Sequence, residues 1–177
     1  MKRPNLPNSL TILRVLATPI GAYALFKNGG DDTTWRIIAW TIFFAIGLTD
    51  IADGKIARAR KQITSFGTFL DPVADKLAIG TAMVGLSMQG KLWWWVTILI
   101  LFREISVTCL RVLVIRGGVI PASKGGKLKT MFQGFGVGFY ILPLPNWLHI
   151  PRDGFMAVAI FLTVATGFDY FYKALKK

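Results

Sequence analysis

The chain has 177 residues, of which 53% are hydrophobic, and it carries a formal net charge of +12. This length suits one domain, but the apolar content exceeds that of an ordinary soluble domain. The basic residues are scattered between apolar stretches and do not gather on one soluble module, so we expect no nucleic-acid partner. The single cysteine, Cys109, excludes an intrachain disulfide.

Apolar segments recur along the whole chain, separated by short basic or Gly/Pro-rich links. Each is close to the roughly 20 residues that cross a bilayer as a helix. Residues 92–102 and 105–115 are each about half that length, so we expect one helix with Arg103 and Glu104 in its interior. The sequence therefore predicts an all-α polytopic membrane protein, with an interfacial lead-in over 1–9 and a six-helix membrane domain over 10–177. The six segments are 10–26, 35–53, 68–88, 92–115, 130–147 and 154–172.

Lysine and arginine concentrate at alternate ends of these segments, which sets the expected orientation. The amino terminus, the Lys55–Lys61 link, the Arg116–Lys129 link and the carboxyl terminus hold most of them. By the positive-inside rule, these parts face the cytoplasm. We therefore expect both termini inside, in a bacterial cytoplasmic membrane, with much of the positive charge facing anionic lipid.

Polar residues recur at three-residue spacing at the start of the first segment, at Asn8, Thr11 and Arg14. On a helix this spacing gives a polar stripe. The stripe either faces a ligand cavity, or consists of a helix cap at Asn8 and a snorkelling anchor at Arg14.

Four aspartates lie at the ends of the second and third segments, where a lone carboxylate is costly. Asp50 and Asp53 are three residues apart, and Asp71 and Asp75 are four residues apart. Both spacings place two positions on one side of a helix. The Lys55–Ser65 stretch between them is basic and polar, so we expect an antiparallel hairpin whose cytoplasmic mouth gathers the four carboxylates in a polar cavity.

Such a cluster needs positive charge, since two carboxylates about 4 Å apart repel by about 4 kcal/mol at an effective dielectric of 20. Ligation by oxygen alone suits Mg²⁺, Mn²⁺ or Ca²⁺, and the lack of a nearby His or Cys argues against zinc. Two such metals can clamp a phosphoryl group. Gly54, Gly67 and Ala57 keep nearby surfaces small for a ligand, and Arg58 offers a planar fork to phosphate.

The pattern Asp50-x2-Asp53-Gly54-x2-Ala57-Arg58-x8-Gly67-x3-Asp71-x3-Asp75 resembles the complete signature of the CDP-alcohol phosphatidyltransferase family. The resemblance implies a six-helix membrane fold, a homodimer, and displacement of CMP from a CDP-linked lipid by an alcohol. It implies two divalent ions, Mg²⁺ or Mn²⁺, held by Asp50, Asp53, Asp71 and Asp75, with Asp75 as general base. It also implies a CDP site formed by Asn8, Thr11, Asp50, Gly54, Ala57, Arg58 and Gly67.

Basic residues after the hairpin point to a phosphorylated acceptor. Arg103 and Arg111 lie about two turns apart on one helix, and Glu104 is expected to pair with a neighbouring cation. The segments Arg-Glu-Ile-x4-Leu-Arg and Ala-Ser-x3-Lys-x-Lys-Thr resemble the branch of the family that uses sn-glycerol 3-phosphate. This resemblance implies CDP-diacylglycerol as donor. The expected acceptor-phosphate residues are Arg103, Arg111, Ser123, Lys127 and Lys129.

Several alternatives remain open at this point. The same enzyme class allows phosphatidylglycerol, serine or an inositol phosphate as acceptor. A divalent-cation transporter is a different class, but Arg58 close to the carboxylates would repel a permeating cation. In the fifth segment, Gly134-x3-Gly138 is expected to permit close packing of helices.

Overall fold

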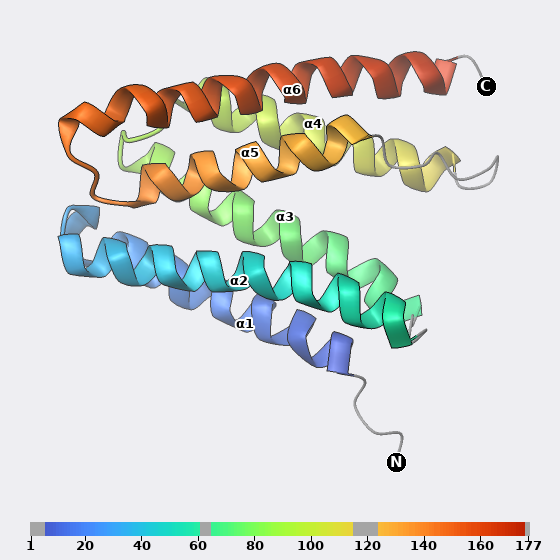
Figure 1. Cartoon of the computed structure of the whole chain (residues 1–177), viewed down its shortest axis with the longest axis horizontal. Helices are drawn as coiled ribbons and strands as arrows, with labels where there is room; N and C mark the ends of the chain where they lie inside the picture. The colour runs from blue at the N-terminus through green and yellow to red at the C-terminus, as the bar shows by residue number, and fades with distance from the viewer. Residues whose placement is uncertain (1–5, 61–64, 115–123, 176–177) are drawn as a thin grey trace. The chain divides into compact units, whose positions relative to one another are not determined.

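The computed structural model describes residues 6–60, 65–114 and 124–175. Every regular element within these residues is a helix, which confirms the all-α prediction. Figure 1 traces them in chain order. They are α1 (Leu6–Phe26), η1 (Lys27–Gly30), α2 (Thr33–Arg60), α3 (Ser65–Met88), α4 (Trp94–Val114), α5 (Lys124–Ile141), η3 (Asn146–Leu148) and α6 (His149–Leu175).

The helices form two compact units. The first comprises residues 1–91 with 141–143 and contains α1, α2 and α3, and the second comprises 92–140 with 144–177. In the first unit α1 packs against both α2 and α3. Leu25, Met83 and Leu86 are fully buried there. In the second unit α4 packs against α6, and Ile100 and Ala159 lie in the core.

Close packing of α1 on α3 depends on Gly85. A Cβ atom at this position would lie 2.8 Å from Cδ2 of Leu25. Because Leu25 is itself fully buried, it has little room to move away. The absence of a side chain at Gly85 therefore sets how closely these two helices approach.

The turn between α1 and α2 is built from residues suited to left-handed backbone, since Asn28, Gly29 and Gly30 have φ of 53°, 74° and 82°. Asp32 then caps α2, because its Oδ1 accepts hydrogen bonds from the backbone N–H groups of Thr34 (2.9 Å) and Trp35 (3.1 Å). Its Oδ2 accepts from Asn28. These hydrogen bonds, that from Asn28 first, lower the pKa of Asp32.

The end of α3 is a Schellman motif. Gly90 has φ of 68°, its N–H donates to the carbonyl of Ser87, and the N–H of Lys91 donates to the carbonyl of Leu86. Lys91 also forms an ion pair with Asp31 at 2.9 Å. The two loops at this end of the first unit are thus tied together.

Two expectations about helix bounds have different outcomes. The prediction of one helix through Arg103 and Glu104 is confirmed by α4, which is continuous from Trp94 to Val114.

The expected fifth segment, 130–147, is wrong in register, because α5 runs from Lys124 to Ile141. Pro143 and Pro145 follow, and proline cannot continue a helix. Arg36 donates through Nε to the carbonyl of Ile141 (2.9 Å) and through Nη2 to that of Leu142 (3.0 Å), which satisfies carbonyls at this helix end.

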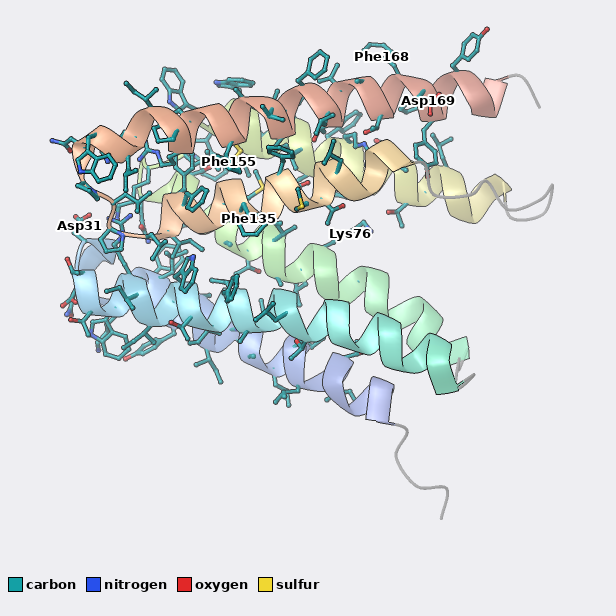
Figure 2. The ribbon with its side chains drawn as sticks, in the orientation of Figure 1. Asp31, Lys76, Phe135, Phe155, Phe168 and Asp169 are labelled. Carbon is teal, nitrogen blue, oxygen red and sulfur yellow. The ribbon has the colours of Figure 1, made fainter. Side chains whose placement is uncertain are left out.

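Among the described residues, close contact between α5 and α6 occurs at Gly136. Gly134 of the expected Gly134-x3-Gly138 pair makes no such contact there, and the role of Gly138 stays a prediction. A Cβ at Gly136 would lie 3.4 Å from Cε and 3.6 Å from the backbone Cα of Met156. A Cβ at Gly134 would meet nothing within 4 Å among the described residues. Phe155 of α6 (Figure 2) packs against α5, and its ring centroid lies 5.5 Å from that of Phe132 and 5.1 Å from that of Phe139.

Apolar side chains cover much of the outer surface. Phe161 and Phe168 on α6 are 70% and 73% exposed, and Phe168 points away from α5 in Figure 2. Among the described residues, the helical stretch Asn146–Tyr172 is long and apolar enough to cross a membrane. Thr33–Thr49 and Lys76–Met88 are shorter apolar stretches. The other membrane crossings stay predictions.

Candidate functional site

The four aspartates lie on a helical hairpin in the first unit. Asp50 and Asp53 belong to α2, and Asp71 and Asp75 belong to α3. The two helices run in opposite directions (Figure 1) and contact each other. The antiparallel hairpin expected from the polar link is therefore present.

Helix geometry places the four positions at matching heights along this hairpin. With a rise of 1.5 Å per residue, Asp50 lies about 15 Å from the end of α2, and Asp75 lies about 15 Å from the start of α3. Asp53 and Asp71 are both about 10 Å from the same ends. The backbone thus pairs Asp50 with Asp75 in height, and Asp53 with Asp71.

The side chains of these four aspartates lie outside the part of the chain that the structure describes. The same holds for the side chains of Asn8 and of Gly54, Ala57, Arg58 and Gly67, although α1, α2 and α3 include their positions. Among the side chains that are described, no group of three His, Cys, Asp or Glu could hold a metal. The metal site on the hairpin stays a prediction, and the ligands that the pattern offers there are carboxylate oxygens.

The polar stripe of α1 lies inside the first unit. Thr11 is 1% exposed and Arg14 is 2% exposed. Thr18, one turn further on, donates from Oγ1 to the carbonyl of Arg14 at 2.9 Å. An anchor that snorkels to the membrane surface keeps its charged head exposed. The anchor interpretation of Arg14 is therefore wrong, and the stripe contributes polar groups to the interior of the unit that also carries the four aspartates.

A charged cluster occupies the interior of the second unit. It consists of Arg103 and Glu104 on α4 and Lys129 on α5, and we call it the Glu104 cluster. Oε1 of Glu104 accepts a hydrogen bond from Nη1 of Arg103 at 3.1 Å and another from the ammonium of Lys129. The exposed fractions of the three side chains are 12%, 17% and 4%. The expected pairing of Glu104 with a neighbouring cation is confirmed.

Helix α6 holds the other side of Arg103. Its Nη2 donates to Oγ1 of Thr166 at 2.8 Å, and its guanidinium carbon lies 5.9 Å from the centre of the Tyr170 ring. A Cβ at Gly167 would lie 3.4 Å from Cγ of Arg103, so the glycine leaves room for the arginine stem. The arginine therefore links α4 to α6.

The sequence interpretation missed these α6 residues because their segment reads as uniformly apolar. A signal was present, since Thr163, Thr166 and Tyr170 recur at spacings of three and four residues. Such spacing marks one side of a helix. All three are buried, although they lie in a stretch apolar enough to cross a membrane.

The remaining expected acceptor residues are only partly described. Arg111 belongs to α4 and Lys127 to α5, but their side chains lie outside the described part. Ser123 lies in the 115–123 stretch, which is not described. Lys129, by contrast, lies on a buried side of α5 together with Gln133, Val137 and Tyr140.

Known proteins similar to this chain agree with these features. The profile of the family described as CDP-alcohol phosphatidyltransferase matches residues 4–166. A protein of Mycobacterium tuberculosis named "Probable phosphatidylglycerophosphate synthase" is 52% identical over 172 residues, covering 97% of this chain and 82% of the relative. One of Bacillus subtilis named "CDP-diacylglycerol--glycerol-3-phosphate 3-phosphatidyltransferase" is 36% identical over 182 residues, covering 96% of this chain and 94% of the relative.

A solved structure shares the fold. The crystal structure of phosphatidylinositol phosphate synthase from Mycobacterium tuberculosis with CDP-DAG bound superposes with a TM-score of 0.65. It is 22% identical and covers 95% of this chain and 85% of its own. The family match spans the hairpin with its four aspartates and the Glu104 cluster. This chain therefore belongs to the CDP-alcohol phosphatidyltransferase family.

Proposed function

We propose that this protein transfers the phosphatidyl group of CDP-diacylglycerol to sn-glycerol 3-phosphate, with release of CMP. The observation that carries the proposal is the complete aspartate signature, set at matching heights on the α2–α3 hairpin. Relatives over nearly the whole chain carry names that state this reaction. Family membership also disfavours the cation-transporter alternative.

The donor site is assigned to the first unit. Asp50, Asp53 and Asp71, with Asp75, would hold two Mg²⁺ or Mn²⁺ ions, because their carboxylates supply only hard oxygen ligands. When bound, such ions offset charge on a diphosphate and make CMP a better leaving group. The CDP moiety is assigned to Asn8, Thr11, Asp50, Gly54, Ala57, Arg58 and Gly67.

Asp75 is assigned the proton transfer. The 1-hydroxyl of glycerol 3-phosphate forms a new bond to the lipid-bearing phosphorus, and the bond from that phosphorus to the CMP oxygen breaks. The hydroxyl proton passes to the Asp75 carboxylate, and CMP leaves with the electron pair. A general base accelerates such a step by lying within hydrogen-bond reach of the proton.

The acceptor's phosphate is assigned to basic residues that follow the hairpin in sequence. Charge-assisted hydrogen bonds from arginine and lysine are the strongest contacts that side chains offer to phosphate. In the described part, two cations are already gathered in the Glu104 cluster. The assigned residues are Arg103, Arg111, Ser123, Lys127 and Lys129.

The setting is assigned to a bacterial cytoplasmic membrane, crossed six times, with both termini and the aspartates on the cytoplasmic side. The distribution of Lys and Arg supports this orientation, and the exposed apolar residues of α4 and α6 support contact with lipid. Residues 10–177 would act as one transferase domain, working as a homodimer. Cross-linking in native membranes would test the dimer.

The direct test is CMP release from CDP-diacylglycerol by purified protein in detergent with Mg²⁺. The reaction is run with sn-glycerol 3-phosphate, with inositol phosphate and without acceptor. Release that depends on glycerol 3-phosphate is expected. Release with inositol phosphate alone would retain the class but refute the acceptor, and no release with any acceptor from folded protein would refute the proposed activity.

A further inference from the structure

Glu104 pairs with two buried cations in the second unit. Nη1 of Arg103 and the ammonium of Lys129 donate to the same oxygen atom, Oε1. Lys129 keeps only 4% of its side chain exposed. A buried ammonium held so far from water needs a partner of opposite charge, and Glu104 supplies it. Helix α4 thus supplies an opposite charge to the Lys129 head group.

Arg103 is fixed from a second side by α6. Thr166 Oγ1 accepts from Nη2 at 2.8 Å and donates in turn to the carbonyl of Leu162 at 2.6 Å. The Thr166 hydroxyl is therefore fixed by the α6 backbone while it accepts from Arg103, which limits rotation of the guanidinium. The arginine in turn orients the carboxylate of Glu104. Thr166 of α6 thus holds Arg103 of α4, and Glu104 of α4 holds Lys129 of α5.

The net charge of the Glu104 cluster favours binding of an anion. Two cations and one carboxylate give a net charge of +1 at neutral pH. A phosphate monoester carries about −1.5 to −2 at that pH. By itself, a carboxylate beside a phosphate site would repel the ligand. Glu104, however, pairs with both cations, so it lowers the repulsion between them before a ligand binds.

We propose that Glu104 is a positioning residue for the acceptor's phosphate: it holds Lys129 and Arg103 in the geometry that receives it. The inference rests on the proposed function, because it assumes a phosphorylated acceptor. It adds a residue of opposite sign to the assigned set, and it gives Thr166 of α6 a role in holding that set.

The test is a kinetic comparison of Glu104→Gln and Glu104→Asp with the wild type. Without the carboxylate charge, the KM for sn-glycerol 3-phosphate should rise at least about tenfold, as expected when a hydrogen bond between charged groups is lost. The KM for CDP-diacylglycerol and kcat at saturating acceptor should stay within about twofold, the signature of lost acceptor binding alone. Glu104→Asp keeps the charge and should recover part of the loss.

Thr166→Val and Thr163→Val form a matched pair. Both threonines are buried on α6 and donate to a carbonyl four residues earlier, but only Thr166 is seen to hold Arg103. Thr166→Val should raise the KM for glycerol 3-phosphate by about three- to tenfold, and Thr163→Val should leave it unchanged. This pair keeps the test open if Glu104→Gln fails to fold.

Other outcomes would refute either the positioning role alone or the proposed function as well. An unchanged or lower KM for glycerol 3-phosphate in Glu104→Gln, or equal changes in both KM values, refutes the positioning role while the proposed function stands. Equal effects of the two threonine variants also refute it. If the wild type uses inositol phosphate instead, the same comparison is made with that acceptor. No CMP release by the wild type with any acceptor ends both proposals.

Discussion

Substitution of Gly136 and Gly134 by valine distinguishes the two ways of interpreting the glycines of α5. The two positions lie on one helix, two residues apart, but they differ in what surrounds them. A Cβ at Gly136 would already lie 3.4 Å from Cε of Met156 and 3.6 Å from its backbone Cα and N. A Cβ at Gly134 would meet no described atom within 4 Å. We expect Gly136→Val to destabilise the protein and Gly134→Val to be tolerated.

The expected magnitude follows from these distances. Alanine fits at Gly136, because its Cβ would make ordinary van der Waals contacts. Valine adds two γ carbons, and the backbone atoms of Met156 cannot yield as a flexible side chain can, so overpacking should cost about 1–3 kcal/mol. At Gly134, valine should gain roughly 0.4 kcal/mol from its higher helix propensity.

The assay is thermal unfolding of both variants and the wild type in the same detergent. For a chain of this size a loss of 1 kcal/mol lowers Tm by about 2–4 °C, so Gly136→Val should lie about 2–12 °C below the wild type. Gly134→Val should match or slightly exceed the wild type, and Gly136→Ala should be close to it. Equal losses for the two valine variants would refute the reasoning, and would show that Gly134 is covered by a surface outside the described residues.

Four further outcomes are expected. Asp75→Asn should abolish turnover and leave CDP-diacylglycerol binding largely intact; loss of binding measured by titration would show that Asp75 mainly holds metal. Arg111→Ala should raise the KM for glycerol 3-phosphate about tenfold, and that for CDP-diacylglycerol much less, because a charged hydrogen bond to phosphate is lost; equal increases would contradict an acceptor role. Excess EDTA should remove activity and Mg²⁺ or Mn²⁺ should restore it, whereas full activity in EDTA would refute the metal assignment. The hydrogen bond from Lys91, followed by its charge, lowers the pKa of Asp31 below the usual 3.8. This ion pair therefore stabilises the fold above that pH, and its contribution is lost as the pH falls through the lowered pKa. As the pH is lowered, Tm should fall less steeply for Asp31→Asn than for the wild type, and identical curves would exclude the contribution.

Some helices follow from the sequence through simple limits of length. Each half of the 92–115 stretch is too short to cross a bilayer, and only one helix through Arg103 and Glu104 satisfies that limit. The structure has this helix as α4. The hairpin of α2 and α3 follows in the same way from a short polar link between two apolar segments.

The register of α5 shows where hydropathy alone is insufficient. An apolar window extends through 147 because Leu142, Leu144 and Trp147 are apolar, yet Pro143 and Pro145 end the helix at Ile141. Backbone hydrogen bonding, and not hydropathy, fixes this end, since Arg36 binds the carbonyls of Ile141 and Leu142. No local pattern around α5 indicates a partner more than a hundred positions away in the sequence.

The candidate site shows the same division. The spacing of the aspartates identifies the family, and it predicts a metal site because metal ligation requires particular atoms at particular helical positions. The support of Arg103 by Thr166 and Tyr170 was not predicted, because one threonine among apolar residues changes a segment average very little. The spacing of these residues marks one side of α6, but their partner Arg103 becomes visible only when the helices are placed against each other.

The two sets of assigned residues differ in charge and in the compact unit that carries them. The aspartates belong to the first unit and are proposed to hold metal ions, whereas the Glu104 cluster belongs to the second and has a net positive charge. Four carboxylates alone would repel a phosphorylated acceptor, so its binding has to come from other residues. The proposed assignment therefore predicts that a change of acceptor requires substitutions in the second unit while the aspartates stay as they are. Substitutions confined to the Glu104 cluster should accordingly change acceptor preference and leave the proposed requirement for divalent metal unchanged.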